Sequence, residues 1–540
     1  MKWNKLMSQM ENNNIRIWTP VLIGIALAGG IFFGRQMAVP AGSVGQAGGA
    51  GYEHSNYQKM QDVIEIIDNY YVDSVDRDAL FEQTIEDMLH KLDPHSNYIS
   101  AKDLQLANEQ IMGEFSGIGV RFFILRDTVC VTNVIKGSPS EQAGLKAGDK
   151  IIKVDGKPVA GVKISNDGIM SKLKGRTNTE VKVGILRNGK QATKSIIRGA
   201  IPIYSVSAAY MIDQETGFIK IDQFSLTTED EFKQASEKLV AKGMKRLVLD
   251  LRGNAGGVLQ TATQIADEFL ANNKIIVSTK GQHSKERFYK ATTKGELEHI
   301  KVAVLINENS ASASEILAGA LQDNDRATIV GRRSFGKGLV QEDMKLRDNS
   351  SLRLTIARYY TPTGRSIQKP YNGNIEDYYH DQIDRYDNGE LYAPDTTKFV
   401  DSLKFITPKG KVVYGGGGIM PDVFVAVDTV GNSWYLAQLR YTMSFQAFAF
   451  DFANGKYEQW KTPQEYARTF QISDALLNQF LKFSEKESGV KIDQSGLKTS
   501  KQWIKNILKA EIARQIWTEE GYFIVMNQLD KEVQTALKQF

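Results

Sequence analysis

The chain has 540 residues, of which 42% are hydrophobic, and this is enough for several domains with cores of their own. Its formal net charge of +4 is spread along the chain without a basic block, so we expect no nucleic-acid partner. The six histidines form no metal-binding spacing, which argues against a metal site, and the one cysteine, Cys130, lies in an apolar strand pattern typical of a small buried residue.

The first 51 residues have the pattern of a membrane-targeting segment followed by a linker. Residues 1–16 are polar and basic, and Ile17–Phe33 is uncharged and mostly apolar. This order predicts a single-pass anchor in the cell membrane, with the rest of the chain on the periplasmic or extracytoplasmic side. Val39-Pro40-Ala41 is a weak cleavage site, so the alternative is a protein secreted to the periplasm after removal of a signal peptide.

Residues 52–112 are predicted to form a helical N-terminal domain. Apolar residues recur at helical spacing through Tyr57–Asn108, and Asp93-Pro94-His95-Ser96 interrupts the pattern. His95 has the chemistry of a general base, and the alternative is a histidine that only forms part of a turn.

Residues 113–199 are predicted to form a compact β-rich domain. Strand patterns alternate with turns at Asp155-Gly156 and Asn188-Gly189, and a helix pattern covers Gly168–Leu173. The run A-G-L-K-A-G-D-K-I-I-K-V-D-G makes this region resemble a PDZ domain.

PDZ domains bind an extended peptide as an added strand and hold its C-terminal carboxylate with backbone N–H groups. The resemblance assigns this carboxylate-binding loop to Ser116, Gly117, Ile118 and Gly119. On its own, such a G-x-G run could equally be a simple turn.

Residues 200–428 show alternating strand and helix patterns. Arg246–Leu251 predicts a buried strand that ends in a glycine-rich loop, D-L-R-G-N-A-G-G. Lys301–Ile306 predicts a second buried strand, followed by a serine-rich turn and a short amphipathic helix. Tyr371–Val400 is acidic and aromatic, which indicates an insertion or a surface loop.

Two features of this region have the chemistry of a nucleophile and its base. A hydroxyl at a strand-to-helix turn lies near N–H groups without helical partners, where the helix dipole favours an oxyanion. Burial favours the neutral amine of a lysine, which can then take a serine proton. Both features have simpler interpretations: Ser312 and Glu315 match an S-x-x-E capping box, and Lys337, between two glycines, could be a surface lysine.

The run S-A-S-A-S-E-I, followed by D-N-D-R-A and F-G-K-G-L-V-Q, closely resembles the C-terminal processing peptidases, also called tail-specific serine proteases. The motifs L-D-P-H-S, D-L-R-x-N-x-G-G and G-G-I-x-P-D extend this resemblance over roughly Tyr57–Val425. It implies an α+β multidomain protein with a helical N-terminal segment, an inserted PDZ domain and an αβ (crotonase-like) serine-protease core over residues 200–428. The resemblance stops there, and helical patterns predict a helical C-terminal domain over residues 429–540.

The resemblance implies a role for each residue that matches a family motif. Ser312 would be the nucleophile, Lys337 the general base, and Gln341 the residue that holds the lysine amine. Asp323 matches an acidic position implicated in some members, and the resemblance gives His95 no chemical role.

An oxyanion hole is also implied by the family pattern. Gly256 or Gly257 would contribute one N–H, together with the N–H of Ala313 that follows the nucleophile. Without the resemblance, the two glycines could form an ordinary turn before a helix.

The predicted function is a serine endopeptidase that cleaves proteins near their C-termini after the PDZ domain recognises the free C-terminus. The expected partners are protein or peptide substrates with free C-termini and, through the N-terminal segment, a membrane; no cofactor is expected, and a homo-oligomer is left open. The alternative is a peptide-binding scaffold without turnover, against which the intact Ser312, Lys337 and Gln341 argue. A crotonase-like acyl-transfer enzyme is a third option supported by core-fold analogy alone.

Overall fold

The computed structural model describes residues 51–394, 400–453 and 459–540. The chain divides into two compact units, residues 1–81 and 82–540, and the first contains α2 (Gly51–Tyr70). In the described part of the chain, no helix is both long and apolar enough to cross a membrane. The predicted membrane segment, Ile17–Phe33, lies outside the described residues.

A short helical region precedes the β-rich domain. Its elements are α3 (Arg77–His90), β1 (Asn97–Ile99) and α4 (Leu104–Met112). The turn that contains Asp93-Pro94-His95-Ser96 joins α3 to β1, and this is the break that the sequence predicts.

The β-rich domain is built on a sheet with the strand order β3-β4-β5-β7-β8, in which β6 pairs with β5. Its strands and helices are β2 (Glu114–Gly117), β3 (Val120–Leu125), β4 (Thr128–Val134), α5 (Pro139–Gln142), β5 (Lys150–Val154), β6 (Lys157–Pro158), α6 (Asn166–Leu173), β7 (Glu180–Arg187), β8 (Lys190–Ile197) and β9 (Gly199–Pro202). Asn188 and Gly189 both have positive φ between β7 and β8, as a two-residue hairpin turn requires. Cys130 on β4 is buried, as predicted, and burial raises the pKa of its thiol to about 11.

The core of the following region is a six-stranded sheet with the order β10-β11-β12-β15-β16-β21, parallel except for the β10–β11 pair. Its strands are β10 (Val206–Met211), β11 (Thr216–Ile221), β12 (Arg246–Asp250), β15 (Lys301–Ile306), β16 (Ala327–Gly331) and β21 (Val423–Phe424). The central strands are apolar and buried on both faces, which is typical of parallel sheets covered on two sides.

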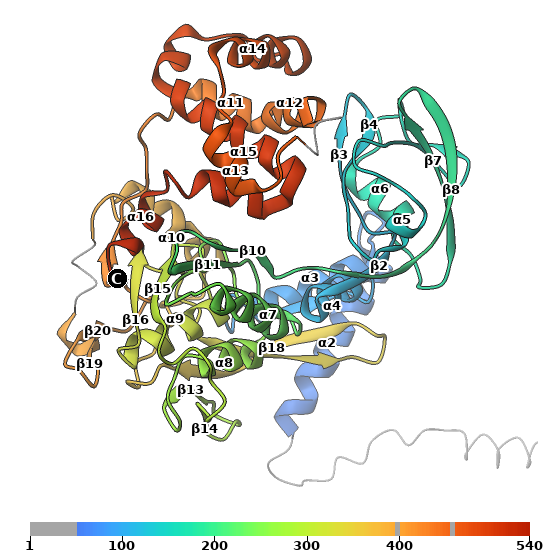
Figure 1. Cartoon of the computed structure of the whole chain (residues 1–540). Helices are drawn as coiled ribbons and strands as arrows, with labels where there is room; N and C mark the ends of the chain where they lie inside the picture. The colour runs from blue at the N-terminus through green and yellow to red at the C-terminus, as the bar shows by residue number, and fades with distance from the viewer. Residues whose placement is uncertain (1–50, 395–399, 454–458) are drawn as a thin grey trace, which may run out of the picture. The chain divides into compact units, whose positions relative to one another are not determined.

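The two faces of this sheet are covered by different parts of the chain. Ile219, Leu249 and Val304 belong to one core with the helices α7 (Thr228–Ala241), α8 (Leu259–Asp267) and α9 (Ala313–Asp323) (Figure 1). Their neighbours along the strands, such as Val248 and Leu305, point the other way and pack against the C-terminal helices.

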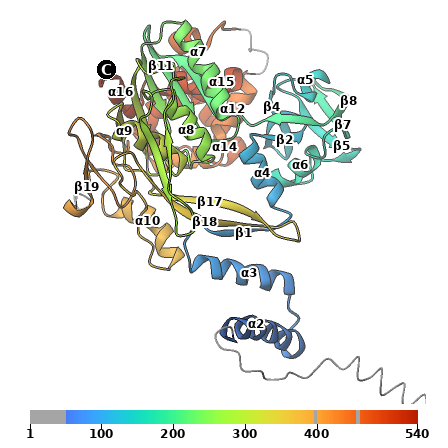
Figure 2. The same cartoon turned by 90° about the horizontal axis from the view of Figure 1, so that it is seen from below.

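A second sheet lies beside the first and carries the segment after Gly338. It contains β1 together with β13 (Ile275–Lys280), β14 (Arg287–Lys290), β17 (Leu339–Lys345) and β18 (Ser351–Tyr360). Strand β18 pairs with β1, β13 and β17, and Figure 2 shows β1, β17 and β18 running together. The turn before β1 is thereby brought next to β17.

In the region 371–400, which we expected to be an insertion or a surface loop, residues 375–387 form the helix α10 (Ile375–Asp387), so the loop alternative is wrong for the helical residues. Tyr378 and Arg385 of α10 are buried, and the guanidinium of Arg385 donates hydrogen bonds to the carbonyls of Arg333, Ser334 and Phe335. The short elements that follow are η2 (Asp401–Leu403), β19 (Lys404–Ile406) and β20 (Val412–Tyr414).

The C-terminal region is helical, as predicted. Its helices are α11 (Trp434–Tyr441), α12 (Ser444–Ala453), α13 (Pro463–Thr469), α14 (Asp474–Ser488), α15 (Gln494–Met526) and α16 (Lys531–Leu537). Helix α15 contacts β10, and α16 contacts β12, β15 and β16, so these helices cover the second face of the parallel sheet.

Candidate active site

The turn between β15 and α9 presents Ser312 at the N-terminus of a helix. Ser312 has φ +54° and ψ −113°, a backbone conformation that residues with a Cβ seldom adopt. Such strain costs about 1–3 kcal/mol and persists only where the surroundings enforce it. The buried hydroxyl of Ser310 helps to fix the turn, because it donates to the carbonyl of Leu251 at 2.9 Å.

The buried carboxylate of Glu315 joins the backbone at Ser312 to the backbone at Lys337. Its Oε2 accepts the N–H of Ser312 at 2.8 Å and the N–H of Lys337 at 2.9 Å. Its Oε1 accepts the N–H of Gly336 at 2.7 Å and the hydroxyl of Ser334. Burial raises the pKa of Glu315, and these four hydrogen bonds act in the opposite direction. The two backbone segments are therefore held within two hydrogen-bond lengths of each other.

A second bridge joins the same two residues. The hydroxyl of Tyr359, which is fully buried on β18, lies 2.7 Å from the carbonyl oxygen of Lys337 and 3.2 Å from that of Ser312. Burial also raises the pKa of Tyr359 well above its usual value, so this group stays protonated and can donate. Spacing along the sequence gave no sign of the roles of Tyr359 and Glu315 in joining these segments.

The side chain of Lys337 is half-buried, and its Nζ donates to Oε1 of Gln341 at 2.8 Å. Burial is the main cause that lowers the lysine pKa from 10.5 to about 8, and the positive charge of Arg353 is the second. Asp93 and Glu315 act against this shift. At this pKa about one lysine in ten is neutral at pH 7, and this neutral fraction can accept a proton.

The glycines on either side of Lys337 allow a close approach of neighbouring backbone. Gly336 has φ +92°, and a Cβ there would lie 3.1 Å from backbone atoms of Gly417 and Gly418. A Cβ at Gly338 would lie 2.9 Å from the backbone nitrogen of Gln368. Larger residues at either position would displace the loop that carries the lysine.

The glycine-rich loop after β12 lies directly against Ser312. A Cβ at Gly256 would be 2.7 Å from Cβ of Ser312 and 2.9 Å from the backbone nitrogen of Ala313. The N–H of Gly256 already donates to Oδ1 of Asn254 at 2.8 Å. Hydrogen bonds from Phe224 to Gly256 and from Val258 to Phe224 flank Gly257, so the N–H of Gly257 points away from Phe224.

Asp323 lies apart from these groups, at the far end of α9. It is eleven residues beyond Ser312, which is about 16 Å along a helix axis. Its carboxylate accepts from Arg365 at 2.7 Å and from the hydroxyl of Thr363 at 2.6 Å, and the side chains of Asp323 and Arg365 are fully buried. The structure thus gives Asp323 a place in a buried ion pair.

His95 lies in the turn before β1, and its carbonyl accepts a hydrogen bond from Nε2 of Gln341. Its ring packs near Phe335 and edge-on to Tyr378, whose hydroxyl is 3.0 Å from Nε2. Burial is the main cause that lowers the pKa of His95 to about 3, so the ring is neutral. The backbone of His95 contacts the candidate site through Gln341.

The four residues of the predicted carboxylate-binding loop follow one another at the start of the β-rich domain. Ser116 and Gly117 end β2 and pair with β9, Ile118 is buried, and Gly119 has φ +80°. The next strand, β3, lies at the edge of its sheet, as strand addition requires.

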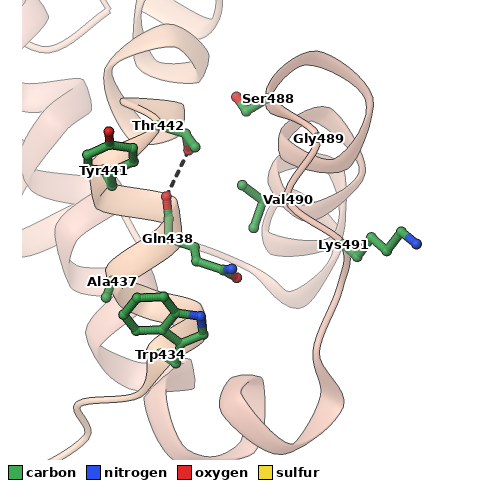
Figure 3. Close-up of a pocket in the computed structure, with 9 residues that line it drawn as sticks. All are labelled: Trp434, Ala437, Gln438, Tyr441, Thr442, Ser488, Gly489, Val490 and Lys491. Carbon is green, nitrogen blue, oxygen red and sulfur yellow. Dashed lines mark hydrogen bonds between the residues drawn. The ribbon is translucent and has the colours of Figure 1, made fainter.

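A cavity of about 790 Å³ lies elsewhere, in the C-terminal helical region. Figure 3 shows Trp434 and Gln438 of α11 facing Val490 across it. None of the predicted site residues lines this cavity, so it is separate from the candidate active site.

Comparison with known proteins gives matches to four family models. Peptidase family S41 matches residues 215–379, the PDZ domain matches 116–197, and the activating protease CtpB N-terminal domain matches 25–103. A carboxy-terminal-processing protease of Bartonella bacilliformis is 36% identical over 354 residues, which are 64% of this chain and 80% of that protein. The chain belongs to the carboxy-terminal-processing protease family.

Other proteins that are similar to this chain include a second bacterial relative and a solved structure. A probable CtpA-like serine protease of Staphylococcus aureus (strain COL) is 35% identical over 317 residues, or 58% of this chain and 63% of that protein. Among solved structures, the photosystem II D1 C-terminal processing protease is 26% identical with a TM-score of 0.36, covering 69% of this chain and 88% of that one. Residues 435–518 of the chain match a family of unknown function, DUF8443.

Proposed function

We propose that this chain is a serine endopeptidase in which Ser312 is the nucleophile and Lys337 the general base. The observation that carries the proposal is the Glu315 carboxylate, one oxygen of which accepts the N–H groups of both residues. The lowered pKa of Lys337 supports the role of base, since only a neutral amine can take the hydroxyl proton.

In the proposed reaction, Oγ of Ser312 attacks the peptide carbonyl carbon while its proton moves to Nζ of Lys337. The tetrahedral intermediate collapses, the C–N bond breaks, and Lys337 returns the proton to the leaving amine. Water then attacks the acyl-enzyme, with Lys337 again taking and returning a proton. Gln341 orients the amine throughout through its hydrogen bond to Nζ.

Of the two glycines considered for the oxyanion hole, Gly257 is the better donor. The N–H of Gly256 is already used by Asn254, whereas that of Gly257 points away from its neighbouring strand. We propose that Gly257 and Ala313 stabilise the oxyanion, each donor contributing about 3–4 kcal/mol to lowering the barrier.

The PDZ domain would select substrates by their free C-termini. We propose that a substrate tail adds to the edge of β3 and that Ser116–Gly119 holds its carboxylate. We also propose that Ile17–Phe33 anchors the chain in a membrane and that catalysis takes place on the extracytoplasmic side. The proposed domains are residues 52–112, 113–199, 200–428 and 429–540, and the domain 200–428 has a crotonase-like core.

The test is incubation of the wild-type chain and Ser312→Ala with an unfolded protein that has an apolar free C-terminus. Mass spectrometry should find C-terminal fragments with the wild type only. Equal inactivity of both chains, with intact peptide binding, would instead support the non-catalytic scaffold.

A further inference from the structure

The side chain of Gln341 connects the turn between α3 and β1 to the candidate base, Lys337. Nε2 of Gln341 donates to the main-chain carbonyl of His95, and Oε1 of the same amide accepts from Nζ of Lys337 at 2.8 Å. A carbonyl oxygen can only accept, so it determines which end of the Gln341 amide faces the lysine. The reversed amide would place two acceptors together at His95 and its NH₂ group against the amine.

The turn that carries the carbonyl of His95 is fixed by hydrogen bonds within the turn and to β18. Oδ1 of Asp93 accepts the N–H groups of His95 and Ser96, both at 2.8 Å, and Oδ2 accepts the hydroxyl of Ser96 at 2.6 Å. The same hydroxyl, which is fully buried, accepts the N–H of Thr355 at 3.0 Å. Thr355 on β18 is the cross-strand partner of Gln341 on β17. The turn is therefore fixed to the pair of strands that carries Gln341.

We propose that the turn Asp93–Ser96 is a positioning element for the amine of Lys337, an inference that rests on the proposed Ser312–Lys337 dyad. A neutral amine has two hydrogens and one lone pair. When Oε1 of Gln341 holds one hydrogen, the range of directions open to the lone pair narrows, and the lone pair can be aimed at Ser312. Through these hydrogen bonds Asp93 and Ser96 act on the amine by way of Gln341, so they are positioning residues; the charge of Asp93 acts on the lysine separately.

The pKa of Lys337 depends on the charges around it, and a pH profile can measure a change in this pKa. Arg353 of β18 lowers the lysine pKa, while Asp93 of the turn and Glu315 of α9 raise it. The ring of His95, whose pKa is about 3, carries no charge near neutral pH. Replacing Asp93 with asparagine keeps the size of the side chain and removes one negative charge, so the pKa of Lys337 should fall.

The experiment measures how fast Ser312 in the full chain reacts with a fluorescent fluorophosphonate between pH 5 and pH 10. For Asp93→Asn we expect the midpoint of the pH profile to move down by about half a unit. For Ser96→Ala we expect labelling that is at least about tenfold slower, because the turn loses the two bonds of the hydroxyl, to Oδ2 of Asp93 and to the N–H of Thr355 on β18. Ser100→Ala is the matched control, since Ser100 donates to Asp103 at 2.7 Å in the next turn, and it should label like the wild type.

Wild-type labelling in Ser96→Ala would overturn the positioning role, and an unmoved midpoint in Asp93→Asn would overturn the assignment of that midpoint to Lys337 beside the charge of Asp93. Failure of the wild type to label, or equal labelling of Ser312→Ala, would overturn the dyad itself, so the two failures are distinguishable. If Ser96→Ala does not fold, judged by its thermal transition, the labelling rate of Asp93→Asn on its high-pH plateau decides the question, and a plateau at the wild-type rate would overturn the positioning role.

Discussion

At Lys337 the proposed chemistry has two requirements: the amine must be neutral, and it must lie beside Ser312. Burial and Arg353 meet the first by lowering the lysine pKa to about 8. The carboxylate of Glu315 and the hydroxyl of Tyr359 serve the second, since each contacts the backbone of both residues and so keeps the two backbone segments close together. The backbones of the proposed base and the proposed nucleophile, which lie on different elements, are thus joined by buried groups that need not react.

The first prediction concerns pH. Protonated Lys337 cannot take a proton, so kcat/KM should be low in acid and rise with pH through a midpoint near 8, the pKa of the lysine. Lys337→Ala should lose at least about 10³-fold in kcat/KM with a peptide substrate. Lys345→Ala, at the exposed end of β17, should keep the wild-type profile. A flat profile together with an active Lys337→Ala would contradict the assignment of the base.

The second prediction concerns Glu315. Glu315→Gln replaces one acceptor oxygen with an NH₂ group that faces N–H or O–H donors, so at least one buried donor loses its partner. We expect kcat/KM to fall more than about tenfold and the free energy of unfolding to fall by about 1–3 kcal/mol. Urea unfolding and peptide hydrolysis measure the two effects. Glu342→Gln, exposed on β17, is the control, and equal behaviour of the two variants would refute the bridging role.

The spacing of Ser312 and Glu315 predicts a helix cap, and Glu315 does accept the N–H of Ser312. The same carboxylate also bonds Gly336 and Lys337, because a loop more than twenty residues later returns over the helix N-terminus. Local spacing carries no information on such a return. The family resemblance named Lys337 and Gln341, which holds the lysine amine, but not Glu315 and Tyr359, which hold the lysine backbone.

At the scale of single elements, β3 is the part of the PDZ domain on which substrate capture would depend. It pairs with β4 on one side and ends the sheet on the other. Val120, Phe122 and Ile124 face the domain core, so the strand is fixed while its outer edge keeps N–H and C=O groups for an added strand.

The third prediction follows from this edge. A peptide with a free C-terminal carboxylate should bind full-length Ser312→Ala at least about tenfold more tightly than its C-terminal amide, because a charged acceptor for backbone N–H groups is lost. Fluorescence anisotropy with the two labelled peptides measures the ratio. A peptide with a shuffled sequence and a free C-terminus is the control for nonspecific binding. Indifference to amidation would argue against carboxylate capture by Ser116–Gly119.

Elements with strong local patterns could be predicted from the sequence, and elements defined by distant contacts could not. Asn188-Gly189 gave the β7–β8 hairpin because two positive-φ residues favour that turn on their own. The helix α10 was missed because its acidic and aromatic residues have the composition of an exposed loop. Its buried members, Tyr378 and Arg385, are fixed by Gln368, Lys369 and the carbonyls of residues 333–335, which lie outside the helix.

At the scale of the second unit, the C-terminal helices complete the core of the protease domain. The sheet residues Phe218, Val248, Leu305 and Val330 are fully buried in a core that they share with α15 and α16. Periodicity predicted helices in this region, but it could not say what their apolar faces cover. Side chains alternate between the two sheet faces along β11, β12, β15 and β16. The residues on one face pack against α7, α8 and α9, and those on the other face are buried by the C-terminal helices.

The fourth prediction is that the protease domain does not fold without this cover. A chain that ends at Asp428 would expose the apolar residues of the second sheet face, so it should aggregate or lack a cooperative thermal transition. In the intact chain, Val533→Asp places a charge at a fully buried position on α16 and should cost several kcal/mol of unfolding free energy.

Lys531→Ala, on the same helix, is the matched control: it removes an exposed ion pair with Asp428, and such pairs contribute at most about 1 kcal/mol. Differential scanning calorimetry compares the three chains with the wild type, and labelling of Ser312 by a fluorophosphonate reports whether the site survives. A truncated chain that is soluble, unfolds cooperatively and labels at the wild-type rate would show that the protease domain folds without α15 and α16 packed on its sheet. The C-terminal helices would then have to act on something other than the protease core.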